Sequence, residues 1–127
     1  MLRTAYNGLL HLILPLLPLR LWWRGRKEPG YLAEVPQRFG RYGSPATTRQ
    51  PLIWLHAVSL GETRAAAPLV RALRTRYPAH RLLITQMTAT GRAAAQESYG
   101  DFAEIAWLPY DFPWAMRRFL AHYRPAL

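Results

Sequence analysis

A chain of 127 residues with a mass of 14.6 kDa is long enough for one small domain with a buried core, and too short for two full domains. Half of its residues are hydrophobic, which excludes a disordered tail, and the absence of cysteine excludes a disulfide framework and a thiolate zinc site. The net charge of +10 predicts an anionic partner, for which nucleic acid, anionic lipid and a phosphorylated substrate all qualify.

Residues 1–23 are predicted to form a membrane anchor. The uncharged run 4–19 would reach roughly 24 Å as a helix, which is short for a bilayer crossing. Pro15 and Pro18 would each remove a helix hydrogen bond, so a tilted or interfacial anchor is favoured over a robust transmembrane helix. The bulky Trp22–Trp23 pair stands where a signal peptide would carry small residues for cleavage, so we expect the segment to be retained.

A cluster of basic residues follows the anchor: Arg20, Arg24, Arg26 and Lys27. Such a cluster holds its end of a membrane segment on the cytoplasmic side and attracts anionic lipids. The alternative is a buried core helix of a soluble domain. It is disfavoured because a core helix rarely ends in basic residues beside two tryptophans.

Residues 24–50 are predicted to be a basic connector. They are rich in Gly, Pro, Arg and aromatic residues and lack helical or strand periodicity, apart from one short helix expected near residues 33–39. From Pro51 onward, short apolar runs alternate with longer amphipathic ones. This alternation is typical of successive βα units in a parallel sheet, so residues 51–127 are assigned to the α/β class.

Three βα units are expected in this domain. The predicted strands are residues 52–58, 81–85 and 104–108, and the predicted helices are 62–77, 92–99 and a last one that ends near residue 122. In the first helix, Pro68 should kink the axis or delay the start, and one apolar face is expected to comprise Ala66, Leu69, Val70, Leu73 and Tyr77. Residues 125–127 look like the beginning of a strand. Because three strands are few for an independent enzyme domain, we expect a truncated chain.

The segment 56–63, His-Ala-Val-Ser-Leu-Gly-Glu-Thr, is the most informative for function because it lies where the first strand gives way to a helix. Open α/β sheets bind ligands at that carboxyl edge. Gly61 lets the backbone approach a ligand closely, and the helix start offers N–H groups to a phosphate or carboxylate. Glu62 is therefore a candidate general base. Ser59-x-x-Glu62 also matches a helix capping box, which the spacing alone favours.

Other kinds of site receive less support. Ser59 with Asp111 and His122 follows the order of a hydrolase nucleophile elbow, but an elbow belongs late in an assembled sheet and not after its first strand. No dinucleotide or phosphate-loop fingerprint is present, and the histidines lack ligand spacing, so no metal site is expected. Nucleic-acid binding is not expected, because the aromatic residues do not interleave a basic sheet face.

Five blocks of sequence occur in one order along the chain. They are residues 20–27 (RLWWRGRK), 37–43 (QRFGRYG), 56–73 (HAVSLGET continuing to APLVRAL), 85–91 (TQMTATG) and 108–111 (LPYD). Together these blocks resemble the bacterial 3-deoxy-D-manno-octulosonic acid (Kdo) transferases, which act on lipid A precursors. The resemblance covers nearly the whole chain, and five blocks in register are strong evidence where any one would be weak.

The resemblance implies a GT-B glycosyltransferase, in which two Rossmann-like domains face each other across a cleft. Residues 51–127 would be an incomplete N-terminal, acceptor-binding domain, and the donor CMP-Kdo would bind a C-terminal domain that this chain lacks. The fragment alone is therefore expected to be inactive. Its location would be the cytoplasmic face of the bacterial inner membrane, where lipopolysaccharide is made.

The implied reaction is an inverting, metal-independent transfer without a cofactor. Glu62 matches the base that deprotonates a glucosamine hydroxyl of the lipid A precursor, and a carboxylate at a helix N-terminus should stay ionised. Ser59, Gly61 and Thr63 are expected to contact the acceptor. The alternatives that stay open are a non-catalytic module that binds anionic lipid surfaces and an inactive remnant, with a nucleic-acid binder as a distant third.

Overall fold

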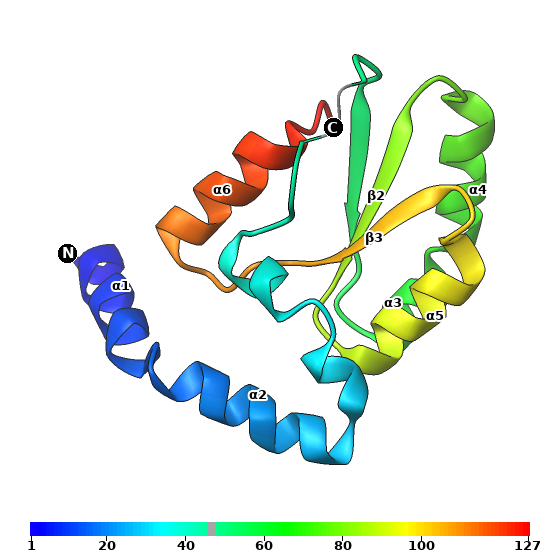
Figure 1. Ribbon diagram of the computed structural model, residues 1–127. Helices are drawn as coiled ribbons and strands as arrows, with labels where there is room; N and C mark the ends of the chain where they lie inside the picture. The colour runs from blue at the N-terminus through cyan, green and yellow to red at the C-terminus, as the bar shows by residue number, and fades with distance from the viewer. Residues whose placement is uncertain (46–47) are drawn as a thin grey trace.

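The computed structural model describes residues 1–45 and 48–127 and has three layers, with a parallel sheet between two helical layers (Figure 1). The three strands lie in the order β1-β2-β3, and the pairing places His56 beside Thr85 and Gln86 beside Trp107. The prediction of an α/β fold with three parallel strands is confirmed. The strands are β1 (Leu52–His56), β2 (Arg81–Gln86) and β3 (Ala103–Trp107).

Helices cover both faces of the sheet (Figure 1). One face carries α3 (Leu60–Ala65), α4 (Ala67–Arg76) and α5 (Ala89–Tyr99), and the other carries α6 (Pro113–Tyr123). Ahead of the sheet lie α1 (Leu2–Ile13), α2 (Leu16–Lys27) and two short 3-10 helices, η1 (Pro29–Leu32) and η2 (Val35–Phe39).

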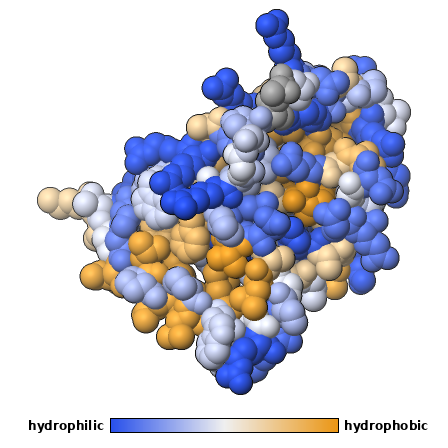
Figure 2. Space-filling view, viewed as in Figure 1, coloured by the Kyte–Doolittle hydropathy of each residue, from blue (hydrophilic) through white to orange (hydrophobic). Residues whose placement is uncertain are grey.

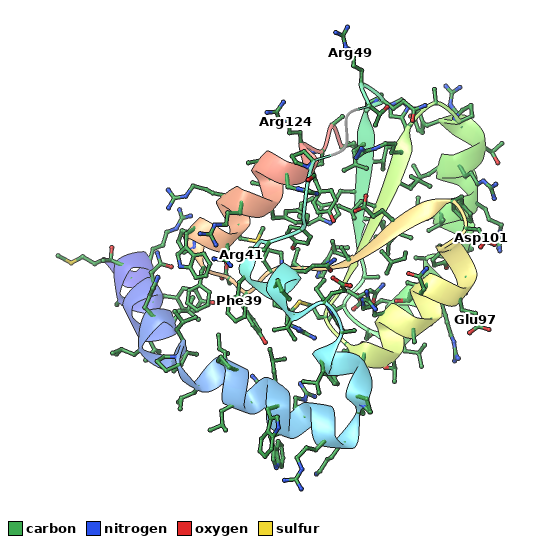
Figure 3. The ribbon with its side chains drawn as sticks, in the orientation of Figure 1. Phe39, Arg41, Arg49, Glu97, Asp101 and Arg124 are labelled. Carbon is green, nitrogen blue, oxygen red and sulfur yellow. The ribbon has the colours of Figure 1, made fainter. Side chains whose placement is uncertain are left out.

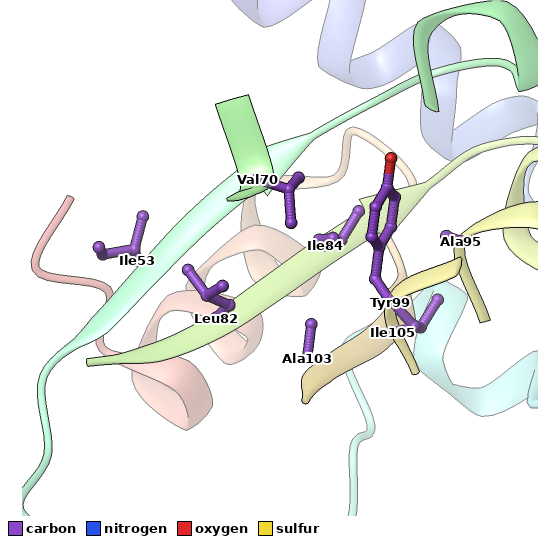
Figure 4. Close-up of a cluster of buried hydrophobic side chains, with 8 residues drawn as sticks. All are labelled: Ile53, Val70, Leu82, Ile84, Ala95, Tyr99, Ala103 and Ile105. Atoms are coloured by element: carbon purple, nitrogen blue, oxygen red, sulfur yellow. The ribbon is translucent and has the colours of Figure 1, made fainter. Parts of the chain in front are cut away.

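The two faces of the sheet bury separate clusters, because alternate side chains of a strand point to opposite sides. The cluster under α4 and α5 consists of Ile53, Val70, Leu82, Ile84, Ala95, Tyr99, Ala103 and Ile105 (Figure 4). The cluster under α6 consists of Leu52, Leu83, Ala106, Phe119 and Tyr123. Burial on both faces explains why the strands read as short apolar runs and not as alternating patterns.

The predicted helix 62–77 is two helices, α3 and α4, which meet at Ala66. Pro68 lies in the first turn of α4, where no backbone hydrogen bond is lost, so the expected delay of the helix start is confirmed. The expected apolar face is only partly buried. Leu69 and Tyr77 are 49% and 39% exposed, whereas three others pack on the core: Ala66, Val70 and Leu73.

The start of the second predicted helix also differs from the prediction. Helix α5 begins at Ala89, three residues before the expected start at Arg92, because Thr88 Oγ1 accepts a hydrogen bond from Gly91 N–H at 3.1 Å and caps the helix there.

Near the chain end, Ala126 N–H donates to Leu52 O at 2.8 Å, and Trp54 N–H donates to Leu127 O at 2.7 Å. These bonds lie along the edge of β1 that faces away from β2, as expected for the beginning of a strand.

The predicted anchor does not form a single helix. It divides at Leu14 and Pro15 into α1 and α2, and Pro18 falls in the first turn of α2, where it costs no hydrogen bond. Helix α2 continues to Lys27, so the start of the predicted connector is helical. None of the helices within residues 1–45 and 48–127 has both the length and the apolar character that a membrane crossing requires.

Candidate active site

The candidate site lies at the carboxyl edge of the sheet, in the turn from β1 to α3. Strands in a parallel sheet all end at the same edge, so the loops after β1, β2 and β3 come together there. Four charged side chains outside the site point into solvent: Arg49 and Arg124 beside the amino end of β1, Glu97 on the outer side of α5, and Asp101 in the turn that follows α5 (Figure 3).

Glu62 and Ser59 form capping interactions at the start of α3. The Ser59 hydroxyl accepts a hydrogen bond from Glu62 N–H at 3.4 Å, and the Glu62 carboxylate accepts one from Val58 N–H through Oε2 at 2.7 Å. The capping interpretation is therefore confirmed, with the carboxylate bonded to the residue before the cap and not to the cap itself. Glu62 is exposed, and its second oxygen, Oε1, accepts no hydrogen bond from the described residues. One oxygen thus holds the side chain in place while the other remains available.

Gly61 leaves open space beside this carboxylate. A Cβ atom added at Gly61 would meet only the Ser59 hydroxyl, at 4.0 Å, so nothing in the described structure covers this part of the helix start. Gly61 is not among the residues with positive φ, so the backbone does not itself require glycine here. A ligand can approach the first turn of α3 closely at this point.

Thr63 is placed differently from Ser59 and Gly61, because its side chain is only 1% exposed. Its hydroxyl donates to Ser59 O at 2.8 Å and lies 3.1 Å from Gln86 Oε1, and its carbonyl accepts from the Tyr99 hydroxyl at 2.8 Å. These bonds attach α3 to β2 and α5. The side chain is not open to a ligand, contrary to the expectation that Thr63 contacts the acceptor.

Gly91 and Gln86 support the site through contacts with the Ser59 loop and with Thr63, and the sequence alone does not indicate these contacts. A Cβ atom at Gly91 would lie 2.5 Å from Gln86 Oε1 and 3.1 Å from the backbone carbon of Ser59. The missing side chain therefore lets α5 pack directly against the loop that carries Ser59. Gln86 is fully buried, and its Oε1 atom lies 3.1 Å from the Thr63 hydroxyl, so it contacts α3 as well.

Replacing Gly91 with alanine is expected to lower the free energy of unfolding by about 1–3 kcal/mol, because the added methyl group overpacks the junction. Denaturant unfolding monitored by circular dichroism would measure the change. The matched control is Gly8→Ala on α1, where nothing lies within 4 Å and alanine should be neutral or stabilising. Equal stability of Gly91→Ala and the native chain would show that α5 does not support the Ser59 loop in this way.

The structure rules out the nucleophile elbow. Asp111 lies before α6 and accepts a hydrogen bond from the Tyr6 hydroxyl at 3.0 Å, which raises the pKa of that phenol. His122 lies at the other end of α6, about 16 Å along the helix axis, where its ring is 5.5 Å from that of Tyr42. Ser59, Asp111 and His122 are therefore not brought together, and the interpretation as a nucleophile elbow is wrong.

Within the described part of the chain, no three His, Cys, Asp or Glu side chains are grouped so that they could hold a metal ion.

A second surface of interest is formed by α1 and α2, whose apolar residues fall into two stripes. The inner stripe packs against the rest of the domain: Leu10, Leu14, Leu17 and Leu21. The outer stripe is between 49% and 90% exposed: Leu2, Tyr6, Leu9, Leu12, Leu16, Leu19, Trp22 and Trp23. Figure 2 shows apolar surface gathered over α1 and the adjoining part of α2. An exposed apolar patch of this extent is typical of an interaction surface.

Comparison with known proteins identifies relatives of the chain. Residues 33–127 match the family 3-Deoxy-D-manno-octulosonic-acid transferase (kdotransferase). The 3-deoxy-D-manno-octulosonic acid transferase of Bordetella pertussis is 47% identical over 97% of this chain and 30% of its own length. The protein of the same name from Haemophilus influenzae is 34% identical over 100% of this chain and 30% of its own length. A probable mitochondrial 3-deoxy-D-manno-octulosonic acid transferase of Arabidopsis thaliana is 33% identical over 94% and 27%.

The chain thus spans less than a third of the length of these curated relatives, 27–30%. No solved structure matches it.

Proposed function

Because the chain belongs to the 3-deoxy-D-manno-octulosonic acid (Kdo) transferase family, we propose that it supplies the acceptor side of an enzyme that transfers Kdo from CMP-Kdo to a lipid A precursor in lipopolysaccharide biosynthesis. The observation that carries this proposal is the Glu62 carboxylate. It is exposed at the carboxyl edge of the sheet, held through Oε2, and open at Oε1 beside the uncovered backbone of Gly61.

Glu62 is the general base of this proposed reaction. A glucosamine hydroxyl of the acceptor attacks the anomeric carbon of Kdo, and its proton passes to the Glu62 carboxylate. The new bond joins the acceptor oxygen to that carbon, while the bond from the carbon to the CMP oxygen breaks and CMP leaves with the electron pair. The hydrogen bond from Val58 N–H fixes the orientation of the carboxylate before the acceptor arrives. Neither a metal ion nor a cofactor enters the step.

The proposed enzyme has the GT-B architecture, with residues 51–127 as part of its N-terminal Rossmann-like domain. The order of the three parallel strands and the helices on both faces support this assignment. CMP-Kdo then binds a further domain, and residues 1–127 by themselves are expected to show no transfer. Acceptor contacts are assigned to Ser59 and to the backbone of Gly61, while Thr63 acts through its support of the loop.

Helices α1 and α2 are proposed to lie in the interface of the inner membrane, on its cytoplasmic face. The outer stripe supplies the apolar contact, and the basic residues at the end of α2 supply attraction to anionic lipids. Lys27 Nζ lies 4.7 Å from the Trp23 ring and the Arg26 guanidinium lies 5.2 Å from the Trp22 ring, an arrangement suited to a headgroup region. Since the acceptor is an anionic glycolipid of the same membrane, enzyme and acceptor would meet by diffusion in two dimensions.

A second candidate function is a lipid-surface binding module without catalysis. The capping bonds of Glu62 favour it, since they explain a glutamate at this position without any reaction. The two candidates differ in the consequence of filling the open space beside Glu62.

The test uses a chimera in which residues 1–127 replace the matching segment of the Bordetella pertussis relative. The chimera is expected to transfer Kdo from CMP-Kdo to a lipid A precursor. Replacing Gly61 with alanine should lower kcat/KM by about tenfold or more, because the methyl group displaces the acceptor from the helix start. It should leave the free energy of unfolding unchanged or raised by up to about 1 kcal/mol, because alanine favours a helix.

Gly8→Ala is the matched control, since Gly8 also lies on a helix with nothing within 4 Å. Full transfer by the Gly61→Ala chimera would contradict an acceptor site at this turn. Loss of transfer in the Gly8→Ala chimera would show instead that the transfer rate is sensitive to any such substitution, even on helix α1.

A further inference from the structure

A small cavity lies between α2 and the loops that follow β2 and β3, and Glu62 is not among the residues that line it. Its volume is about 110 Å³, and three arginines line it together with aromatic residues: Arg20, Arg24, Arg38, Tyr31 and Tyr110. No acidic side chain is among the lining residues. The walls therefore carry positive charge without an internal counter-ion.

Arg38 is the buried member of this group. Segment η2, which carries it, and the residues just before it are fixed to the end of β3. Trp107 N–H donates to Gln37 Oε1 at 3.0 Å, and Trp107 Nε1 donates to Ala33 O at 2.7 Å. The guanidinium carbon of Arg38 lies 3.8 Å from the centroid of the Trp107 ring and 5.6 Å from that of Tyr31. Only 3% of the residue is exposed. The aromatic rings hold the guanidinium in place at the cavity.

Two donors of this guanidinium, Nε and Nη2, are buried and have no hydrogen-bond partner among the described residues. Nε and Nη2 form one edge of the planar group, the edge that binds two oxygens of an oxyanion side by side. A buried charge with unsatisfied donors destabilises a folded chain unless something pairs with it. Burial lowers the pKa of Arg38, with Tyr110 and Tyr31 opposing that effect, and an anion in the cavity would favour the charged guanidinium further.

We propose that the cavity binds a phosphomonoester through the Nε–Nη2 edge of Arg38, with Arg20 and Arg24 supplying further charge. Three cations favour a dianionic phosphate over a singly charged carboxylate, and the small volume admits the phosphate group and not a larger ligand. The phosphate comes either from solution or from a lipid headgroup, because α2 also carries the outer stripe. The phosphate site consists of residues other than Glu62, so its test is independent of the test of the proposed Kdo transfer.

The experiment follows the Arg38 Nε–H signal by NMR while inorganic phosphate is added to the chain, with sodium chloride of equal ionic strength as the reference. We expect a saturable shift. Arg38→Gln should weaken phosphate binding, followed by backbone amide signals, by about tenfold or more, and Arg24→Ala, on the exposed surface of α2, by about threefold or more. Circular dichroism and thermal unfolding establish whether Arg38→Gln is folded, and Arg24→Ala decides the question if it is not.

Arg117→Ala is the matched control, because Arg117 is an exposed arginine on α6 that does not line the cavity and belongs to neither stripe of α1 and α2. Its affinity for phosphate should stay within about twofold of the native value. The proposal is overturned if phosphate gives no saturable shift, or if Arg117→Ala weakens binding as much as Arg24→Ala. Vesicles of equal surface charge then distinguish the two sources of phosphate. If vesicles of phosphatidic acid, a monoester, compete with inorganic phosphate and vesicles of phosphatidylglycerol, a diester, do not, the ligand is a lipid headgroup. If neither kind of vesicle competes, the ligand is the free ion.

Discussion

Replacing Glu62 with glutamine is expected to lower kcat for Kdo transfer by the chimera about 10²–10⁴-fold, which is the usual contribution of a general base. Glutamine has nearly the same shape and keeps a carbonyl oxygen that can accept the hydrogen bond from Val58 N–H, so the cap of α3 should persist. What it loses is the ability to take up the proton of the acceptor hydroxyl. Single-turnover assays with CMP-Kdo and a lipid A precursor would measure the rate of the chemical step.

The matched control is Glu97→Gln, the same substitution on an exposed glutamate on the outer side of α5 (Figure 3). Its transfer rate and its stability should both equal those of the unsubstituted chimera. If Glu62→Gln retained full transfer while the unsubstituted chimera was active, Glu62 would be a capping residue and the base would have to be sought elsewhere.

Placing glutamates at Leu12 and Leu19 is expected to lower the affinity of the chain for anionic vesicles at least about 100-fold. Both leucines belong to the outer stripe, at 76% and 60% exposed, and burying one leucine side chain contributes about 1.5–3 kcal/mol. The substitutions also bring negative charge toward an anionic surface, which opposes binding further. Sedimentation with vesicles of phosphatidylethanolamine and phosphatidylglycerol would measure the change.

The control for this pair is the double substitution Leu69→Glu with Leu120→Glu. These leucines are 49% and 45% exposed, on α4 and α6, and lie outside the outer stripe. They change the net charge of the chain by the same amount. If both double variants lost vesicle binding equally, attraction by net charge and not the outer stripe would govern attachment.

The sequence predicts the fold well because each βα unit repeats the same local pattern. Apolar runs and amphipathic runs alternate in the order that the structure shows, and a parallel sheet follows from that order. The boundaries are less predictable, because they depend on single capping or proline positions. Thr88 starts α5 earlier than periodicity suggests, Pro68 divides the first helix, and α1 and α2 separate at Pro15.

The candidate site is predictable only as far as local sequence determines it. Ser59, Gly61 and Glu62 stand at a strand-to-helix turn, so their place at the sheet edge follows from the order of elements. The burial of Thr63 depends on contacts with Gln86 and Tyr99, which other βα units supply, and the sequence does not reveal these contacts.

Arg38 illustrates the same limit more strongly. It occurs in a basic connector without periodicity, and nothing near it in the sequence indicates that it is buried. Its position results from the docking of η2 on Trp107, at the end of β3. A buried arginine among aromatic residues is visible only after segments distant in the chain have been brought together.

The claim that residues 58–62 form the acceptor site is tested most directly by mapping where a lipid A precursor contacts the chain. Backbone amide NMR spectra of the chain, bound to nanodiscs of phosphatidylethanolamine and phosphatidylglycerol, would be compared with and without the precursor in the disc. We predict that the amide signals of Gly61, Glu62 and Val58 shift or broaden on addition of the precursor, and that the signals of α6 do not. Unchanged signals at these three residues, in nanodiscs that still hold the chain through α1 and α2, would contradict the assignment.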